Sequence, residues 1–137
     1  MTKVAGDEAV RYLREHSDAI LVVDGSAMSR STLRRNLEYY GFTVAEAADA
    51  TQALEVYGAR RPPIGLVLLD VTTTGTEART VVTRLLQSDP QVRIVLCADQ
   101  APSQVRRTER QTGIVGVLRK PVRTDRLLDA VSKALGI

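Results

Sequence analysis

Short apolar runs recur along this chain at intervals that leave room for a helix between most of them. The runs are rich in Val, Ile and Leu, and three of them lack apolar–polar alternation, which is typical of strands covered on both faces. They are Ala19–Val23, Phe42–Ala45, Ile64–Leu69, Val92–Cys97 and Ile114–Leu118. Strands that alternate with helices indicate βαβ units. We therefore predict an α/β fold, in which one doubly wound parallel sheet lies between two helical layers.

Capping residues mark where the helices begin and end. We expect Ser26 or Ser29 to cap a helix that Gly41 ends, and Asp49 to cap a second helix that Gly58 closes. Two further helices are predicted to begin at Thr76 and at Pro102, and Thr124 is predicted to cap the last helix.

An N-terminal extension, residues 1–17, precedes the first strand. Within it, Asp7–His16 has the spacing of a short amphipathic helix with Val10 and Leu13 on its apolar side. Such a helix is a packed cap, a dimer contact or a connector from an upstream domain, and the sequence leaves all three open. His16 has no partner at ligand spacing, so we interpret it as a surface residue. No linker or repeat divides residues 18–137, which predicts one domain there.

Composition excludes several classes of protein. The 137 residues are 44% apolar and 26% charged, an ordinary balance for a globular domain. No run approaches the ~18 apolar residues of a membrane helix, no secretory signal opens the chain, and the single cysteine, Cys97, cannot form an internal disulfide. We therefore expect a cytoplasmic protein without a membrane contact.

The net charge of +3 does not by itself indicate nucleic-acid binding. Arginines cluster at two places, Arg30/Arg34/Arg35 and Arg106/Arg107/Arg110, but aromatic residues make up only 4% of the chain and no DNA-binding motif is present. We interpret the arginine clusters as solvated helix faces that Glu38, Glu46 and Glu109 neutralise in part.

Chemically useful side chains lie at the ends of four predicted strands. Asp24 and Asp70 follow the first and third runs, Cys97 ends the fourth, and Lys120 lies just past the fifth. The carboxyl ends of parallel strands meet at one edge of a sheet, where ligands bind. Two carboxylates suit Mg²⁺, an aspartate can act as a nucleophile toward phosphorus, and a lysine offers positive charge to phosphoryl oxygens. The pattern predicts phosphoryl acceptance with Asp70 as the nucleophile.

From Ala19 to Leu135 the sequence resembles the receiver domain of bacterial two-component response regulators. The resemblance is carried by "ILVVDG", "GFTVAEAADATQALE", "LVLLD" and "LRKPV". It implies a flavodoxin-like (βα)5 fold for residues 18–137, with the extra N-terminal helix outside it. It also implies a phosphoacceptor domain rather than an enzyme.

The resemblance assigns roles to individual residues. Asp70 would accept the phosphoryl group, Lys120 would contact it, and Asp24, Asp70 and the backbone carbonyl of Thr72 would hold Mg²⁺. Cys97 stands at the position where the family usually has Thr or Ser, whose hydroxyl contacts the phosphoryl group and moves with it. The Lys120-Pro121 bond is commonly cis in the family.

This chain departs from the family's usual pattern in ways that bear on its switch. Gly25 replaces the second of two adjacent acids, so one metal-ligating carboxylate is missing and we expect Mg²⁺ to bind weakly. Cys97 offers only a weak thiol donor, and Val117 replaces an aromatic residue that rotates in step with the switch. After Asp70 the chain reads "VTTTGTEA", with Glu77 where the family has a later acid. We expect a receiver with a degenerate active site and impaired switching.

The partners implied are a histidine kinase or phosphotransfer protein upstream and a protein downstream. The downstream face would consist of the helix over 102–111, the strand over 114–118 and the last helix, with a homodimer as a further option. Its arginines are Arg106, Arg107, Arg110 and Arg119.

Two alternatives stay open. One is a pseudo-receiver, an interaction module of the same fold that works without phosphate. The other is a small flavodoxin-like enzyme or nucleotide binder, which would need a phosphate-binding loop that "DGSAMSR", with its single glycine, does not supply.

Overall fold

The computed structural model of the chain describes residues 2–71, 78–99 and 112–137. Within these residues, five parallel strands form one sheet in the order β2-β1-β3-β4-β5. The strands are β1 (Ala19–Val23), β2 (Val44–Ala47), β3 (Ile64–Asp70), β4 (Ile94–Ala98) and β5 (Ile114–Arg119). The helices are α1 (Thr2–Glu15), α2 (Ala27–Tyr39), α3 (Ala50–Ala59), α4 (Ala78–Ser88) and α6 (Thr124–Ala134). The predicted α/β fold with a doubly wound parallel sheet is confirmed.

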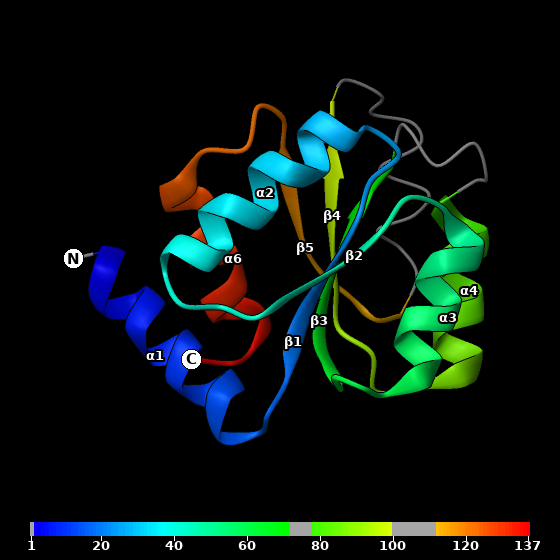
Figure 1. Cartoon of the computed structure of the whole chain (residues 1–137), viewed down its shortest axis with the longest axis horizontal. Coiled ribbons are helices and arrows are strands. Elements are labelled where there is room, and N and C mark those ends of the chain that lie inside the picture. The colour runs from blue at the N-terminus through cyan, green and yellow to red at the C-terminus, as the bar shows by residue number, and fades with distance from the viewer. Residues whose placement is uncertain (1, 72–77, 100–111) are drawn as a thin grey trace.

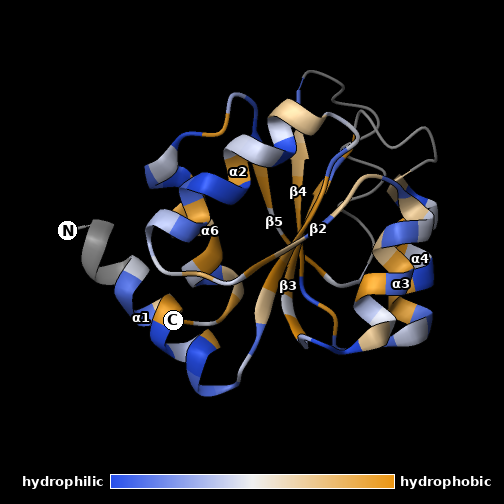
Figure 2. Cartoon of the chain, viewed as in Figure 1, coloured by the Kyte–Doolittle hydropathy of each residue, from blue (hydrophilic) through white to orange (hydrophobic). Residues whose placement is uncertain are grey.

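Helices cover both faces of the sheet, which accounts for the apolar character of the central strands. In Figure 1, α1, α2 and α6 lie on one side, and α3 and α4 lie on the other. Alternate residues of β1 enter different cores: Ile20 and Val22 pack toward α2 and α6, whereas Leu21 and Val23 pack toward α3 and α4. The hydrophobic colouring of Figure 2 is accordingly concentrated on the strands. Both cores together give the three layers that the sequence predicts.

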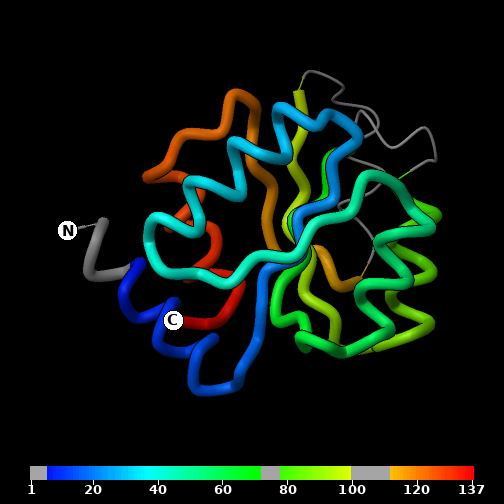
Figure 3. The backbone as a smooth tube through the Cα atoms, in the orientation of Figure 1, coloured from blue at the N-terminus to red at the C-terminus, as the bar shows by residue number. Residues whose placement is uncertain are grey.

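Helix α1 is built into the core on the α6 side. It packs along α6, and Figure 3 shows the C-terminal end of the chain beside it. Ala9 and Leu13 are almost fully buried, and Leu13 lies so close to Gly65 that a Cβ there would be 2.7 Å from Leu13 Cδ2. The helix spans Thr2–Glu15, so it begins five residues before the predicted Asp7. These contacts are those of a packed cap.

Several predicted boundaries are wrong by a few residues. Strand β2 begins at Val44, not at Phe42, because Gly41 turns the chain with a φ of 101° and the Phe42 amide still bonds to the carbonyl of Leu37. Helix α3 continues past Gly58 to Ala59, and its C-cap residue, Arg60, adopts the left-handed conformation.

Two other strand and helix boundaries also differ. Strand β4 starts at Ile94, two residues after Val92, and its last residue is Ala98, one residue past Cys97. Thr124 is not the N-cap of α6: Arg123 occupies that position, and no side-chain hydrogen bond caps the helix.

The other caps follow the sequence. The Ser26 hydroxyl accepts a hydrogen bond from the amide of Ser29, so Ser26 is the N-cap of α2. Asp49 caps α3 by accepting from the amide of Gln52 at 2.8 Å. The predicted starts at Thr76 and Pro102 lie outside the described residues.

Candidate functional site

The carboxyl edge of the sheet brings together three side chains from distant parts of the sequence. Asp24 follows β1, Asp70 ends β3 and Lys120 follows β5. Strands β1 and β3 are neighbours, with Val23 beside Leu69, so the two aspartates that come next lie side by side. Lys120 reaches both acids across β4, and its backbone amide bonds to the carbonyl of Ala98. The sequence predicted this convergence from the strand ends.

The side-chain alternation of the strands continues into this edge. Ile20 and Val22 of β1 face the core on the α2 and α6 side, and Asp24 is the next residue of that parity. Leu66 and Leu68 lead in the same way to Asp70, and Leu118 leads to Lys120. All three polar side chains are therefore directed toward the first turn of α2.

Lys120 forms an ion pair with each acid. Its Nζ lies 3.2 Å from Asp24 Oδ2 and 3.2 Å from Asp70 Oδ2. Both carboxylates are 1% exposed and the Lys120 side chain is 18% exposed, so the charges interact in a largely desolvated place. We refer to Asp24, Asp70 and Lys120 as the acidic site. The Lys120-Pro121 peptide bond is cis, as the resemblance implies.

Three residues at the start of α2 hold Asp24: the N-cap residue Ser26, and Ser29 and Arg30 of the first helical turn. The amide of Ser26 donates to Asp24 Oδ1 at 2.9 Å, and the hydroxyl of Ser29 donates to Asp24 Oδ2 at 2.5 Å. Arg30 donates to the backbone carbonyl of Asp24 at 2.7 Å and pairs with Glu46 at 3.1 Å. These contacts fix both the carboxylate and the backbone at the end of β1.

The electrostatics favour the ionised forms of Asp24 and Lys120. Burial alone would raise the pKa of Asp24, but the hydrogen bonds from Ser29 and Ser26 and the Lys120 ammonium hold that pKa below its ordinary value. Burial would lower the pKa of Lys120, but Asp70 and Asp24 raise it above its ordinary value. Lys120 is therefore a stable positive charge and not a base at neutral pH.

Cys97 lies beside Asp70 in the sheet and is 1% exposed. It packs in the core with Leu118 and Leu127, as a small buried hydrophobic residue does. Burial raises the pKa of the thiol to about 12, and the nearby Lys120 offsets only part of this effect. Its side chain is thus a neutral thiol at physiological pH.

The residues present offer Mg²⁺ two carboxylates. In the described part of the chain, no three or more His, Cys, Asp and Glu side chains form a group that could hold a metal ion by themselves. Asp24 and Asp70 both direct an oxygen at the Lys120 ammonium, so a cation between them would meet the hard oxygen ligands that Mg²⁺ prefers. Thr72, the third predicted ligand, lies outside the described residues, as does Glu77. The donor set fits Mg²⁺.

Other predicted residues lie away from the acidic site. His16 is exposed, stacks on Tyr12 with ring centroids 4.4 Å apart and contacts the Tyr12 carbonyl at 2.7 Å. Glu46 pairs with Arg30 and with Arg34, which supports the interpretation of that arginine cluster as a neutralised helix face. Arg106, Arg107, Arg110 and Glu109 lie outside the described residues.

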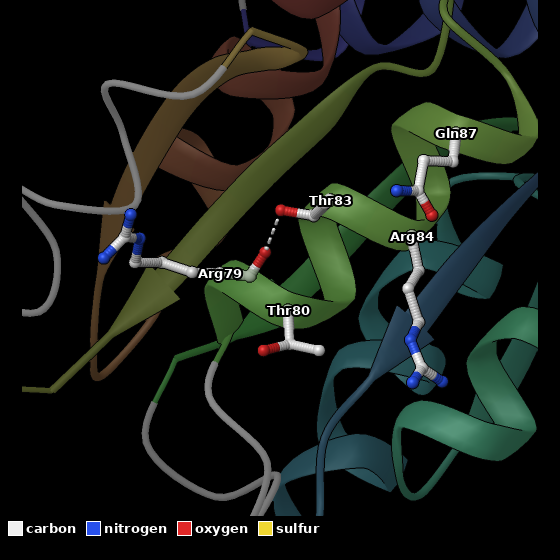
Figure 4. A pocket seen from close by; sticks show the side chains of 5 residues that line it. All are labelled: Arg79, Thr80, Thr83, Arg84 and Gln87. Atoms are coloured by element: carbon white, nitrogen blue, oxygen red, sulfur yellow. Dashed lines mark hydrogen bonds between the residues drawn. The ribbon is translucent and has the colours of Figure 1, made fainter.

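A shallow hollow of about 330 Å³ lies on α4 and is separate from the acidic site. Its lining consists of polar side chains of that one helix, shown in Figure 4: Arg79, Thr80, Thr83, Arg84 and Gln87. The dashed line there is the bond from the Thr83 hydroxyl to the Arg79 carbonyl, a contact within the helix. Among the residues that the structure describes, the lining of the hollow includes no carboxylate and none of the acidic-site residues.

The sequence did not reveal that Ser29 contacts the acidic site. It entered only as an alternative helix cap, whereas its hydroxyl binds Asp24 and also lies 3.4 Å from Lys120 Nζ. The available signal was its position: once Ser26 caps α2, a residue three positions later lies on the first helical turn, which faces back toward the strand end.

Comparison with known proteins identifies the family. The response regulator receiver domain family matches residues 20–132. The chain belongs to this family. It is 33% identical over 117 residues to the chemotaxis protein CheY of Bacillus subtilis, a match that covers 85% of this chain and 96% of the relative. A receiver domain takes part in two-component signalling as a phosphoacceptor rather than as a classical enzyme.

Solved structures agree with this fold. A signal receiver domain of an HD domain-containing protein from Pseudomonas fluorescens superposes with a TM-score of 0.77 and 26% identity, over 87% of this chain and 94% of that one. The CheX–CheY–BeF3–Mg²⁺ complex of Borrelia burgdorferi contains a chain with a TM-score of 0.77 and 23% identity, matched over 86% of this chain and 89% of that one. The flavodoxin-like receiver fold with an additional N-terminal helix is thus confirmed. Among the described residues, no helix is long and apolar enough to cross a bilayer.

Proposed function

We propose that this receiver domain accepts a phosphoryl group on Asp70, from the phosphohistidine of a histidine kinase or phosphotransfer protein. The observation that supports this most directly is the position of Lys120 Nζ, 3.2 Å from both Asp70 and Asp24. An Asp70 carboxylate oxygen would attack phosphorus, a P–O bond would form and the P–N bond to the histidine would break. The displaced imidazole would leave with its electron pair.

Each member of the acidic site has a defined part in this proposal. Lys120, kept protonated by the two acids, would neutralise the phosphoryl oxygens as they approach Asp70. Asp24, Asp70 and the backbone carbonyl of Thr72 would hold Mg²⁺. When bound, Mg²⁺ supplies positive charge that stabilises the transferring phosphoryl group. The proposal places the domain in the cytoplasm, where such kinases present their phosphohistidine.

We further propose that Mg²⁺ binds weakly because Gly25 contributes no carboxylate. With Asp24, Asp70 and Lys120, the site carries two negative charges and one positive charge before a cation enters. A second acid at position 25 would make the net charge more negative by one unit. Its absence costs about 1–3 kcal/mol of metal-binding free energy, the worth of one charge-assisted contact.

Cys97 and Val117 support a weakened switch. Cys97 is a buried neutral thiol, so it would hold a phosphoryl oxygen poorly. Val117 is 41% exposed on β5 and is too short to swing between a buried and an exposed position as an aromatic side chain can. A phosphoryl group on Asp70 would thus be signalled to the β5 face less efficiently.

The second candidate function is that of a pseudo-receiver, which binds a partner without phosphate. It is favoured by the exposed edge strand β5, which presents Val115 and Val117, at 44% and 41% exposure, beside the exposed Arg119. This strand belongs to the face that we propose for a downstream protein or a second copy of the chain. Affinity for that partner would then be the same for the phosphorylated and unphosphorylated domain.

Phosphorylation of Asp70 can be tested directly. The protein is incubated with Mg²⁺ and acetyl phosphate, and intact mass is measured for wild type and for Asp70→Asn. We expect the phosphate mass increment in wild type only, and peptide mapping should place it on Asp70. A wild-type chain without the increment at saturating Mg²⁺ would leave the pseudo-receiver as the function.

The Mg²⁺ deficit can be tested by restoring the missing acid. Gly25 is not among the described glycines with positive φ, which are Gly41, Gly113 and Gly136, so an aspartate fits its backbone. Gly25→Asp should tighten Mg²⁺ binding. Binding is measured by the amide NMR shifts of Asp24 and Asp70, because the chain has no Trp whose fluorescence could report it. Gly58→Asp, at an exposed glycine of α3, is the control for added charge elsewhere. Equal affinity in both variants would contradict our account of Gly25.

A further inference from the structure

The hydroxyl of Ser29 takes part in two contacts at the acidic site that the roles proposed above do not require. It donates to Asp24 Oδ2 at 2.5 Å, and it lies 3.4 Å from Lys120 Nζ. The same Asp24 oxygen also receives Lys120 at 3.2 Å. Ser29, Asp24 and Lys120 therefore form a closed triangle of hydrogen bonds.

The position of Ser29 is imposed by its surroundings. Ser26 caps α2 and binds Asp24 through its amide, while Arg30 anchors the Asp24 carbonyl and Glu46. Ser29 lies between these two anchors on the first turn of the helix. Its hydroxyl is thus held against the Asp24 carboxylate without having to order a flexible segment.

The contacts match the hydrogen-bonding capacity of Lys120. An ammonium group has three N–H donors. Within the described residues, three oxygen atoms lie within 3.4 Å of Lys120 Nζ, and they belong to Asp24, Asp70 and Ser29. Ser29 supplies the only neutral acceptor of the three, so it adds a bond without adding charge.

We propose that Ser29 is a positioning residue that ties Asp24 to Lys120 and so competes with a divalent cation for the Asp24 carboxylate. The proposal rests on the proposed function, because it concerns the same metal-binding acids. Its physical basis is that a carboxylate oxygen has two lone-pair sites. Ser29 and Lys120 both bind Oδ2, so a cation that takes this oxygen must displace one of them.

Gly25 makes this competition matter more. A receiver with a second acid at that position could bind the cation mainly through the second carboxylate and leave Asp24 bound to its donors. In this chain Gly25 has no carboxylate, so the cation has to draw on Asp24 and Asp70. Ser29 then sets how readily Asp24 is released.

Mg²⁺ affinity of Ser29→Ala tests the proposal. The matched control is Ser31→Ala, the same change at a half-buried serine two residues further along α2. Removing the competing hydrogen bond should tighten Mg²⁺ binding to Ser29→Ala by roughly five- to tenfold, the worth of one such bond, and Ser31→Ala should match wild type. Ser29→Thr keeps a hydroxyl and should stay close to wild type. Ser29→Ala that binds Mg²⁺ no better than wild type, or not at all, overturns the proposal.

A second measurement needs no metal. With Ser29 present, NMR should detect the Lys120 ammonium protons as slowly exchanging with water, and in Ser29→Ala they should exchange faster. Unchanged exchange would contradict the tie between Ser29 and Lys120. A circular dichroism melt confirms that each variant is folded.

The outcome for the proposed function is separate. If wild type acquires no phosphate from acetyl phosphate while Ser29→Ala shows tighter Mg²⁺ binding and faster ammonium exchange, the phosphoacceptor role fails and the positioning role of Ser29 stands. If wild type is phosphorylated but Ser29→Ala behaves as wild type in both measurements, the phosphoacceptor role stands and the positioning role of Ser29 fails.

Discussion

Replacing Lys120 by methionine should destabilise the fold far more than replacing an exposed lysine. The Lys120 ammonium lies 3.2 Å from each of two carboxylates that are 1% exposed. At this separation and an effective dielectric constant of about 20, each attraction is about 5 kcal/mol before the cost of desolvation is subtracted. Removing one partner of a buried ion pair typically costs about 3–5 kcal/mol, because it leaves charge buried and unpaired. We expect a loss of that size for Lys120→Met at pH 7.

The control for this experiment is Lys133→Met. Lys133 pairs with Asp129 at 3.1 Å on α6, but the two side chains are 74% and 59% exposed. Water screens such a pair, so its loss should cost below about 0.5 kcal/mol. Both variants lose the same ammonium group, and only the surroundings differ.

The assay is urea denaturation followed by circular dichroism, with the free energy of unfolding extrapolated to water. The loss in Lys120→Met should shrink as the pH is lowered toward 4, because protonation of one carboxylate removes the repulsion between Asp24 and Asp70. Mg²⁺ should restore part of the stability of the variant, since a cation replaces the missing charge. A loss no larger than that of Lys133→Met would refute the reasoning.

Other predictions concern pH and packing. Because the pKa of Asp24 is held below its ordinary 3.8 by its hydrogen bonds and Lys120 despite burial, its contribution to stability should be present above pH 3.8 and disappear as the pH falls through the folded pKa. The pKa of Lys120 is raised above 10.5 by Asp70 and Asp24 despite burial, so its contribution to stability should be present below pH 10.5 and be lost as the pH rises through the folded pKa. Urea denaturation at a series of pH values should show both the loss at acid pH and the loss at alkaline pH. Gly65→Ala would place a Cβ 2.7 Å from Leu13 Cδ2 and should cost about 1–3 kcal/mol in urea denaturation. Gly58→Ala, with nothing within 4 Å of its Cβ, should instead gain about 0.5–1 kcal/mol, and equal effects of the two changes would refute the close packing of α1.

Much of the fold could be predicted because burial on both faces leaves a plain pattern. The runs in β1 and β3 are continuously apolar since their alternate residues enter different cores. The start of β2 was predicted two residues early because Phe42 is apolar and buried, yet its amide still belongs to the end of α2. Hydropathy reports burial, and it cannot report which backbone group binds the amide.

The acidic site could be predicted in part for a similar reason. Asp24, Asp70 and Lys120 come directly after strands or at their ends, and strand ends of a parallel sheet converge whatever the intervening helices contain. Ser29 depends instead on the angle at which α2 leaves β1, which places its hydroxyl against Asp24. That angle results from tertiary contacts such as Arg30 with Glu46, sixteen residues apart in sequence, and no local pattern encodes it.

The sheet also divides the chain into two regions that can diverge at different rates. Because Asp24, Asp70 and Lys120 share the side of the sheet that faces α2 and α6, the layer beneath α3 and α4 is screened from them by the strands themselves. Substitutions such as Leu85→Ile in the α4 layer should alter stability while leaving Mg²⁺ affinity as it is. Leu118 and Leu127 pack in the same core as Cys97, so substitutions at these two leucines should change stability and Mg²⁺ affinity together. The layer of α3 and α4 can therefore accept substitutions that leave the acidic site unchanged, whereas substitutions in the layer of α2 and α6 also affect Mg²⁺ binding.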